Sequence, residues 1–276
     1  MKIQLRRSAI YAVLTLICWG LCTTDHSVSA GVLTITTPPG DGVSGNGQSE
    51  RPFTNAGDAN GNRYQQVYSS DLFSGVGALQ SISSVAFRPK QGAFGNIING
   101  SVTLRGLTIN LSTTPRDANT DFPNGISSDL ALNVGADSQT VFSGDITLTT
   151  DRRFGDTDVE DFDFYIPFTQ SFLYQPGQGN LLLEVIVAAR SDAVSSRFTQ
   201  LDQFTDGFPS RDGTASANDS NLLNDNDPFG TVGSNSTTGA VTQFETQAVP
   251  EPSSMAILLG IALTGGLASR RRTNRS

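Results

Sequence analysis

The middle of the chain alternates short apolar segments with turn-forming residues. In segment 162–168, phenylalanine or isoleucine recurs at every second position, the period of a strand with one buried face. Segment 181–189 is apolar at nearly every position, which predicts a central strand covered on both faces. By the same reasoning we expect strands at 32–37, 64–68, 82–87, 102–111, 141–149, 197–204 and 241–246.

Two local features refine this pattern. Between Leu104 and Leu107 the apolar parity changes across Gly106, which predicts a β-bulge. Residues 126–133 predict one short helical turn. Helical patterns between the strands are scarce, which argues against a parallel α/β sheet. The predicted fold class is therefore all-β, an antiparallel two-sheet sandwich that is jelly-roll-like.

The N-terminus has a different pattern. Lys2, Arg6 and Arg7 precede an apolar stretch from Ala9 to Cys22, and small residues follow up to Ala30. This order is typical of a secretory signal peptide helix, with cleavage between Ala30 and Gly31. The apolar stretch is short for a permanent transmembrane anchor. We therefore predict a signal peptide at 1–30 and a body domain at 31–249.

The C-terminus, 250–276, combines three parts in a fixed order. Pro250, Glu251 and Pro252 come first, and a short apolar run from Met255 to Ala268 follows. An arginine cluster ends the chain: Arg270, Arg271, Arg272 and Arg275. The apolar run is near the lower limit for a membrane-spanning helix, and the arginines favour the cytoplasmic side. A helix of a soluble domain is the alternative, but adjacent arginines directly after an apolar run disfavour it.

This tail resembles the PEP-CTERM sorting signal of Gram-negative bacteria. The resemblance implies that the tail rests transiently in the inner membrane and is recognised and removed by an exosortase, while the secretion machinery exports the body. Pro250, Glu251 and Pro252 match the recognition motif, so the resemblance implies that the partner enzyme reads them.

The body also resembles a domain that PEP-CTERM proteins often carry. The matching segments are LTINLSTTP (107–115), ISSDLALNVGAD (126–137), VFSGDITLTT (141–150) and FLYQPGQGNLLLEV (172–185). This resemblance covers about residues 82–189 and implies export to the envelope. It implies no active site.

Removal of both ends changes the chemistry that remains. Both cysteines, the single Trp and the single His lie before Gly31, so the body contains none of these residues. Disulfides, thiol nucleophiles, Ser–His–Asp triads and zinc sites of the usual His or Cys type are excluded from the body. We therefore expect no enzymatic activity and no catalytic residues.

Charge separates the possible partners. The whole chain has a formal net charge of −8. The two ends together contain seven basic and two acidic residues, which leaves the body at −13. Nucleic acid and anionic lipid are therefore poor partners, and divalent cations are better ones. Extracellular polysaccharide is the partner expected from the export signals, and the charge does not select it. A high net charge also serves solubility alone.

Calcium is the only cofactor for which the body offers candidates, and we otherwise expect none. The segment 151–163 is rich in acidic residues, and Asp156, Asp158, Glu160 and Asp161 supply oxygen ligands. It is not an EF-hand loop, because Asp161 stands where the required glycine belongs. A solvated loop is the simpler interpretation. Asn62, with Asp58 and Asn60, is a weaker calcium candidate, and 218–227 reads as a polar surface loop.

Two further hypotheses concern sugars. Glu184 lies within an apolar strand, where burial would suit a general acid of a glycan hydrolase. The structural alternatives are a glutamate at an edge or on a sheet face that points to solvent, and one paired with Arg190 or another arginine. Tyr64, Tyr68, Phe73 and Arg63 are candidates for a carbohydrate-binding face. The leading hypothesis is an exported envelope or matrix protein of structural or interaction type. A carbohydrate-binding or calcium-dependent adhesion module is the alternative, and a secreted glycan hydrolase comes third.

Overall fold

The structure is a computed structural model of the chain. It describes residues 32–37, 47–49, 51–53, 61–90, 100–118, 124–150, 161–188, 201–205, 214–219, 234–236 and 238–249. The long strands are β1 (Val32–Thr37), β3 (Asn62–Tyr68), β4 (Gln80–Phe87), β5 (Gly100–Thr114), β6 (Gln139–Thr150), β7 (Phe164–Tyr174), β8 (Asn180–Val187) and β13 (Thr242–Ala248). The short strands are β2 (Gly47–Ser49), β9 (Leu201–Thr205), β10 (Thr214–Asp219), β11 (Ser234–Ser236) and β12 (Thr238–Ala240). The 3₁₀ turns are η1 (Ser70–Phe73), η2 (Leu130–Asn133) and η3 (Pro176–Gln178).

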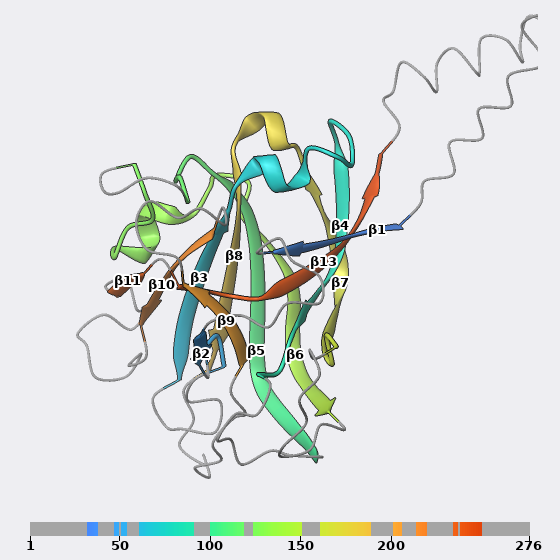
Figure 1. The fold of residues 1–276 in the computed structure, drawn as a ribbon, viewed down its shortest axis with the longest axis vertical. Helices are drawn as coiled ribbons and strands as arrows, with labels where there is room; N and C mark the ends of the chain where they lie inside the picture. The colour runs from blue at the N-terminus through green and yellow to red at the C-terminus, as the bar shows by residue number, and fades with distance from the viewer. Residues whose placement is uncertain are drawn as a thin grey trace, which may run out of the picture. The chain divides into compact units, whose positions relative to one another are not determined.

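Two antiparallel sheets form the fold (Figure 1). One has four strands in the order β1-β13-β4-β7, and the other has six in the order β11-β10-β3-β8-β5-β6. Going along the chain, β1, β4, β7 and β13 enter the first sheet, while β3, β5, β6 and β8 enter the second. This interleaved order is that of a jelly roll, as the sequence predicts. A small sheet, β12-β9-β2, adds to it.

The core lies between the two sheets. Phe244 on β13 meets Tyr68 on β3 with ring centroids 5.0 Å apart in an edge-to-face contact. Both side chains are fully buried. The Tyr68 hydroxyl also accepts a hydrogen bond from Thr242 Oγ1 at 2.9 Å. Aromatic contacts and a satisfied hydroxyl together fix how the sheets face one another.

Most of the predicted strands are confirmed. β8 lies between β3 and β5 and is buried on both faces, because a second layer covers its outer side. The bulge is also confirmed, since the β5–β6 register shifts between Leu104 and Leu107, and Gly106 has a φ of 63°. The predicted helical turn is η2. In β7, Phe164 and Ile166 face the core, but the strand begins at Phe164 and continues to Tyr174.

The polar strands were not predicted. β10 includes Asn218 and Asp219, so the prediction of a surface loop is wrong at these residues; residues 220–227 lie outside the described residues. β10 is held by backbone pairing to β3 on one side and β11 on the other. Backbone pairing needs no apolar side chains, which is why hydrophobic alternation does not reveal such strands.

Among the residues that the structure describes, no helix has the length and apolar character to cross a membrane. The predicted signal peptide and the apolar run of the tail lie outside the described residues, so both stay predictions.

Candidate functional site

The first region of interest is where the body meets its two ends. β1 and β13 pair antiparallel, with Val32 opposite Gln247. The start of β1 and the end of β13 therefore lie at the same end of the four-stranded sheet (Figure 1). Val249 still belongs to the fold, because its N–H donates to the carbonyl of Leu79 at 2.9 Å. The described body thus extends to the residue directly before Pro250.

The second region is the outer face of the six-stranded sheet, where Glu184 is buried. Arg63 donates to Glu184 Oε1 from Nε at 2.8 Å and from Nη2 at 2.7 Å. Gln65 donates to the same oxygen at 2.7 Å, and Asn110 donates to Oε2 at 2.7 Å. Both carboxylate oxygens are therefore bonded inside the protein, and the predicted pairing with an arginine is confirmed with Arg63.

The segment 126–135, which contains η2 and is called the covering segment below, packs on this face beside Glu184. Leu130 and Ile126 pack with Val67 and Leu182 in a small apolar cluster. Asn133 donates to Gln65 Oε1 at 2.8 Å, which links η2 to the Glu184 network. This part of the sheet is therefore covered and has its polar groups paired inside the protein.

Asp202 on β9 is the second buried carboxylate. Arg88 donates to its Oδ2 from Nε at 2.9 Å and from Nη2 at 2.6 Å. Lys90 donates to Oδ1 at 3.0 Å. The Arg88 guanidinium also lies 5.5 Å from the centroid of the Phe162 ring. This group of charges attaches β9 to the end of β4, which is a structural role.

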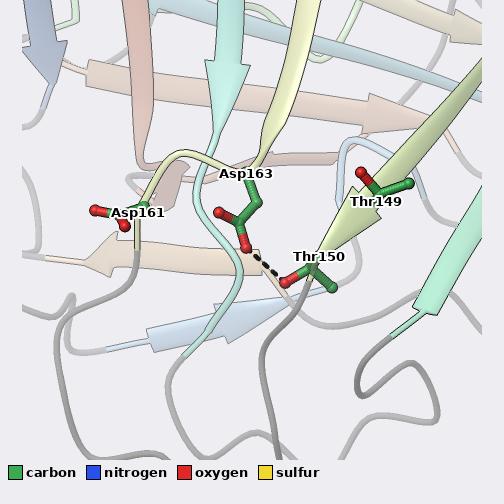
Figure 2. Close-up of a pocket in the computed structure, with 4 residues that line it drawn as sticks. All are labelled: Thr149, Thr150, Asp161 and Asp163. Atoms are coloured by element: carbon green, nitrogen blue, oxygen red, sulfur yellow. Dashed lines mark hydrogen bonds between the residues drawn. The ribbon is translucent and has the colours of Figure 1, made fainter.

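Asp161 and Asp163, at the end of the predicted calcium segment, border a cleft of about 430 Å³ (Figure 2). Its described lining residues are Thr149, Thr150, Asp161 and Asp163. Asp163 accepts a hydrogen bond from Thr150 Oγ1 at 2.6 Å, and Asp161 points away from this pair. Within the described part of the chain, no three acidic, His or Cys side chains gather to hold a metal. Asp156, Asp158 and Glu160 lie outside the described residues, so calcium binding stays a prediction.

The outer face of the four-stranded sheet carries a different set of groups. Tyr165 on β7 is 44% exposed, and its hydroxyl donates to Glu245 Oε2 at 2.9 Å. Ser84 donates to the same oxygen at 3.0 Å, and Gln243 donates to Thr36 Oγ1 at 3.3 Å. In contrast to the other sheet, this face combines an exposed aromatic ring with hydroxyl and amide groups.

The predicted carbohydrate-binding face is wrong. Tyr64, Tyr68 and Phe73 are fully buried in the core between the sheets, and Arg63 points to the opposite side, where it binds Glu184. Adjacent positions on a strand face opposite ways, and Tyr64 and Tyr68 share the parity that faces the core. Sequence reasoning missed Tyr165. Its position between Phe164 and Ile166, which both face the core, was the signal in the sequence that Tyr165 lies on the outer face.

The sorting residues cannot be placed geometrically, because Pro250, Glu251, Pro252 and the four arginines lie outside the described residues. Ala30 and Gly31 lie outside them as well. The weaker calcium candidates Asp58 and Asn60 are not described either. Asn62 is described and buried, with its amide donating to the Pro52 carbonyl at 2.8 Å.

Comparison with protein families identifies the tail. Residues 248–272 match the PEP-CTERM protein-sorting motif, which confirms the resemblance drawn from the sequence. The match begins at Ala248, the last residue of β13. No curated protein and no solved structure matches this chain significantly. The motif marks the chain as an exported protein that an exosortase sorts to the cell envelope or surface.

Proposed function

We propose that this chain is the precursor of a non-enzymatic surface protein of a Gram-negative bacterium. Its signal peptide, 1–30, directs export, and its tail, 250–276, holds the precursor in the inner membrane until exosortase removes it. The jelly-roll body, 31–249, then acts as a structural or interaction domain in the envelope or the extracellular matrix. The observation that carries this proposal is the sorting motif at 248–272.

The buried carboxylates support a non-enzymatic body. Glu184 is held by Arg63, and Asp202 is held by Arg88 and Lys90. A glycan hydrolase needs two carboxyl groups that face a substrate across about 5 to 10 Å. Both of these carboxylates instead neutralise cations inside the fold.

Deletion of Pro250–Ser276 tests the sorting proposal. We expect the truncated protein to leave the cell by a different route or to accumulate elsewhere, measured by fractionation and by the intact mass of the secreted form. Replacement of the four tail arginines by alanine tests the membrane step separately. Unchanged location and unchanged mature mass in the deletion variant would contradict the proposal.

Carbohydrate binding by the body is a second candidate, and the face around Tyr165 favours it. An exposed aromatic ring stacks on a sugar ring while neighbouring hydroxyl and amide groups bind sugar hydroxyls. The amide of Gln243 lies one strand away from Tyr165, and the carboxylate of Glu245 accepts from the Tyr165 hydroxyl.

The test is affinity electrophoresis of the body in gels that contain the producing cell's own extracellular polysaccharide. We expect retardation, and we expect Tyr165→Ala to abolish it while Leu132→Ala does not. Leu132 is a matched control because it is also exposed, at 54%, and lies on η2 over the other sheet. Equal migration with and without polysaccharide would contradict this candidate.

A further inference from the structure

The sorting motif directly follows the folded body. Ala248 pairs with Gln80 of β4, and the N–H of Val249 is bonded to Leu79. The next residue is Pro250, which has no N–H and cannot continue the ladder. The sequence therefore provides no spacer between the last hydrogen-bonded residue of the sandwich and the Pro-Glu-Pro triplet.

β13, the strand before the motif, cannot unpair to lengthen the linker between the body and the apolar run. β13 is paired with β1 on one side and with β4 on the other, so its backbone groups are used at both edges. Phe244 is fully buried and Thr246 is 1% exposed. Release of even the last few residues of this strand would expose core side chains and break hydrogen bonds between the strands.

The connection to the apolar run is short. Five residues, Pro250–Ser254, separate Val249 from Met255. Fully extended, the six steps from the Cα of Val249 to that of Met255 reach about 20 Å. The headgroup layer on one side of a bilayer is about 6 Å thick. When the apolar run is in the membrane, the end of β13 must therefore lie close to the headgroups.

The other end of the body is in the same place. Val32 lies opposite Gln247, and only Gly31 separates β1 from the predicted cleavage after Ala30. Both membrane-directed segments of the precursor thus leave the body from one end of one sheet. The pairing of β1 with β13 can form while both segments are still in the membrane.

The side chains at this end suit a lipid surface. Leu173 is 59% exposed, the highest value among the large apolar side chains of the described residues. It lies in register with Ser81 and, through it, with Gln247. The row Leu173–Ser81–Gln247 carries no charge, unlike the strongly acidic body as a whole.

We infer that this end of the four-stranded sheet, defined by Leu173, Ser81 and Gln247, is a membrane-facing surface. It lies on the lipid headgroups while the tail awaits processing. The inference rests on the proposed function, because it requires the tail to be inserted. It adds the orientation of the body: the sheet end with both termini faces the bilayer, and η2 on the six-stranded sheet does not.

A fluorescence quenching experiment tests this orientation. The full chain carries Cys18→Ser and Cys22→Ser, and because the rest of the chain has no cysteine, one new cysteine can be labelled. The variants are Leu173→Cys and, as the matched control, Leu132→Cys. Each labelled chain is reconstituted in phosphatidylethanolamine–phosphatidylglycerol vesicles with and without headgroup-nitroxide lipid. We expect the nitroxide to cause loss of fluorescence at position 173 and little loss at position 132.

A spacer variant makes the test sharper. Insertion of about 20 Gly and Ser residues between Val249 and Pro250 adds roughly 25 Å of root-mean-square reach. We expect it to abolish the quenching at position 173 while vesicle binding persists. Equal quenching at both positions, or no quenching at 173 in vesicle-bound protein, would overturn the inference and leave the sorting proposal intact. Failure of the chain to bind vesicles would overturn both.

Discussion

The two sheets of the sandwich differ in what their outer faces contact. The six-stranded sheet is covered by the segment that contains η2, and its buried Glu184 is satisfied by Arg63, Gln65 and Asn110. The outer face of the four-stranded sheet carries the exposed ring of Tyr165, and this sheet holds both ends of the described body. The difference shows that the six-stranded sheet is packed on both of its faces, while the four-stranded sheet presents an exposed aromatic ring on its outer side.

The largest expected effect comes from the core that both sheets share. Phe244→Ala removes a fully buried ring that contacts Tyr68 and Phe73. We expect a loss of about 4 kcal/mol in the free energy of unfolding, measured by chemical denaturation of the body. Gln247→Ala on the exposed face of the same strand is the control and should change stability by less than about 0.5 kcal/mol. Similar losses for both variants would show that β13 is not packed as described.

The next effect compares one glutamate on each outer face. Glu184→Leu leaves the Arg63 charge without its buried partner, and we expect a loss of about 3 kcal/mol. Glu245→Leu removes a partly exposed carboxylate on the open face and should cost less than about 1 kcal/mol. Both values follow from urea unfolding curves.

A double variant separates the ion pair from simple packing. Arg63→Met combined with Glu184→Leu removes both charges, so it should be more stable than Glu184→Leu alone. A double variant that is less stable than the single one would mean that the network acts through packing and neutral hydrogen bonds.

The covering segment itself offers a smaller effect. A Cβ added at Gly135 would lie 1.8 Å from the carbonyl oxygen of Thr113, so Gly135→Ala must push the segment away from β5. We expect a loss of about 2 kcal/mol, in the range of overpacked sites, measured by thermal unfolding. Gly75→Ala is the matched control, because nothing lies within 4 Å of its added Cβ. No difference between the two variants would mean that the segment moves without cost.

The smallest expected effect concerns alkaline pH. Burial raises the pKa of Tyr68 well above its ordinary value of 10, and burial with nearby Asp71 raises the pKa of Tyr174. The fold therefore favours the neutral phenols. Their contribution to stability is full below pH 10 and is lost as the pH rises further, because the unfolded chain releases these protons first.

The melting temperature should accordingly fall between pH 9 and pH 11. The melting temperature of the Tyr174→Phe variant should fall less steeply over this range, because this variant lacks one of the two buried phenols. Leu132→Ala serves as the control, because it changes an exposed side chain and removes no phenol. A melting temperature that stays level up to pH 11 would contradict the burial of both phenols.

The sequence by itself determined the elements whose side chains carry a period. β7 and β8 were predicted from their apolar patterns, and the bulge at Gly106 from a change of parity. These features are local, so neighbouring residues along the chain are sufficient to specify them. The tail motif is local in the same sense, and the family comparison confirms it at 248–272.

Tertiary structure decided what depends on which strands become neighbours. Glu184 has its partners on β3 and β5 because those strands flank β8, and their distance in sequence hides this pairing. The sheet order likewise decided that the side of β3 with Tyr64 and Tyr68 faces the core. It also brought Val32 beside Gln247, which places both ends of the body together. Long-range pairing produces each of these facts, and no period along the chain records it.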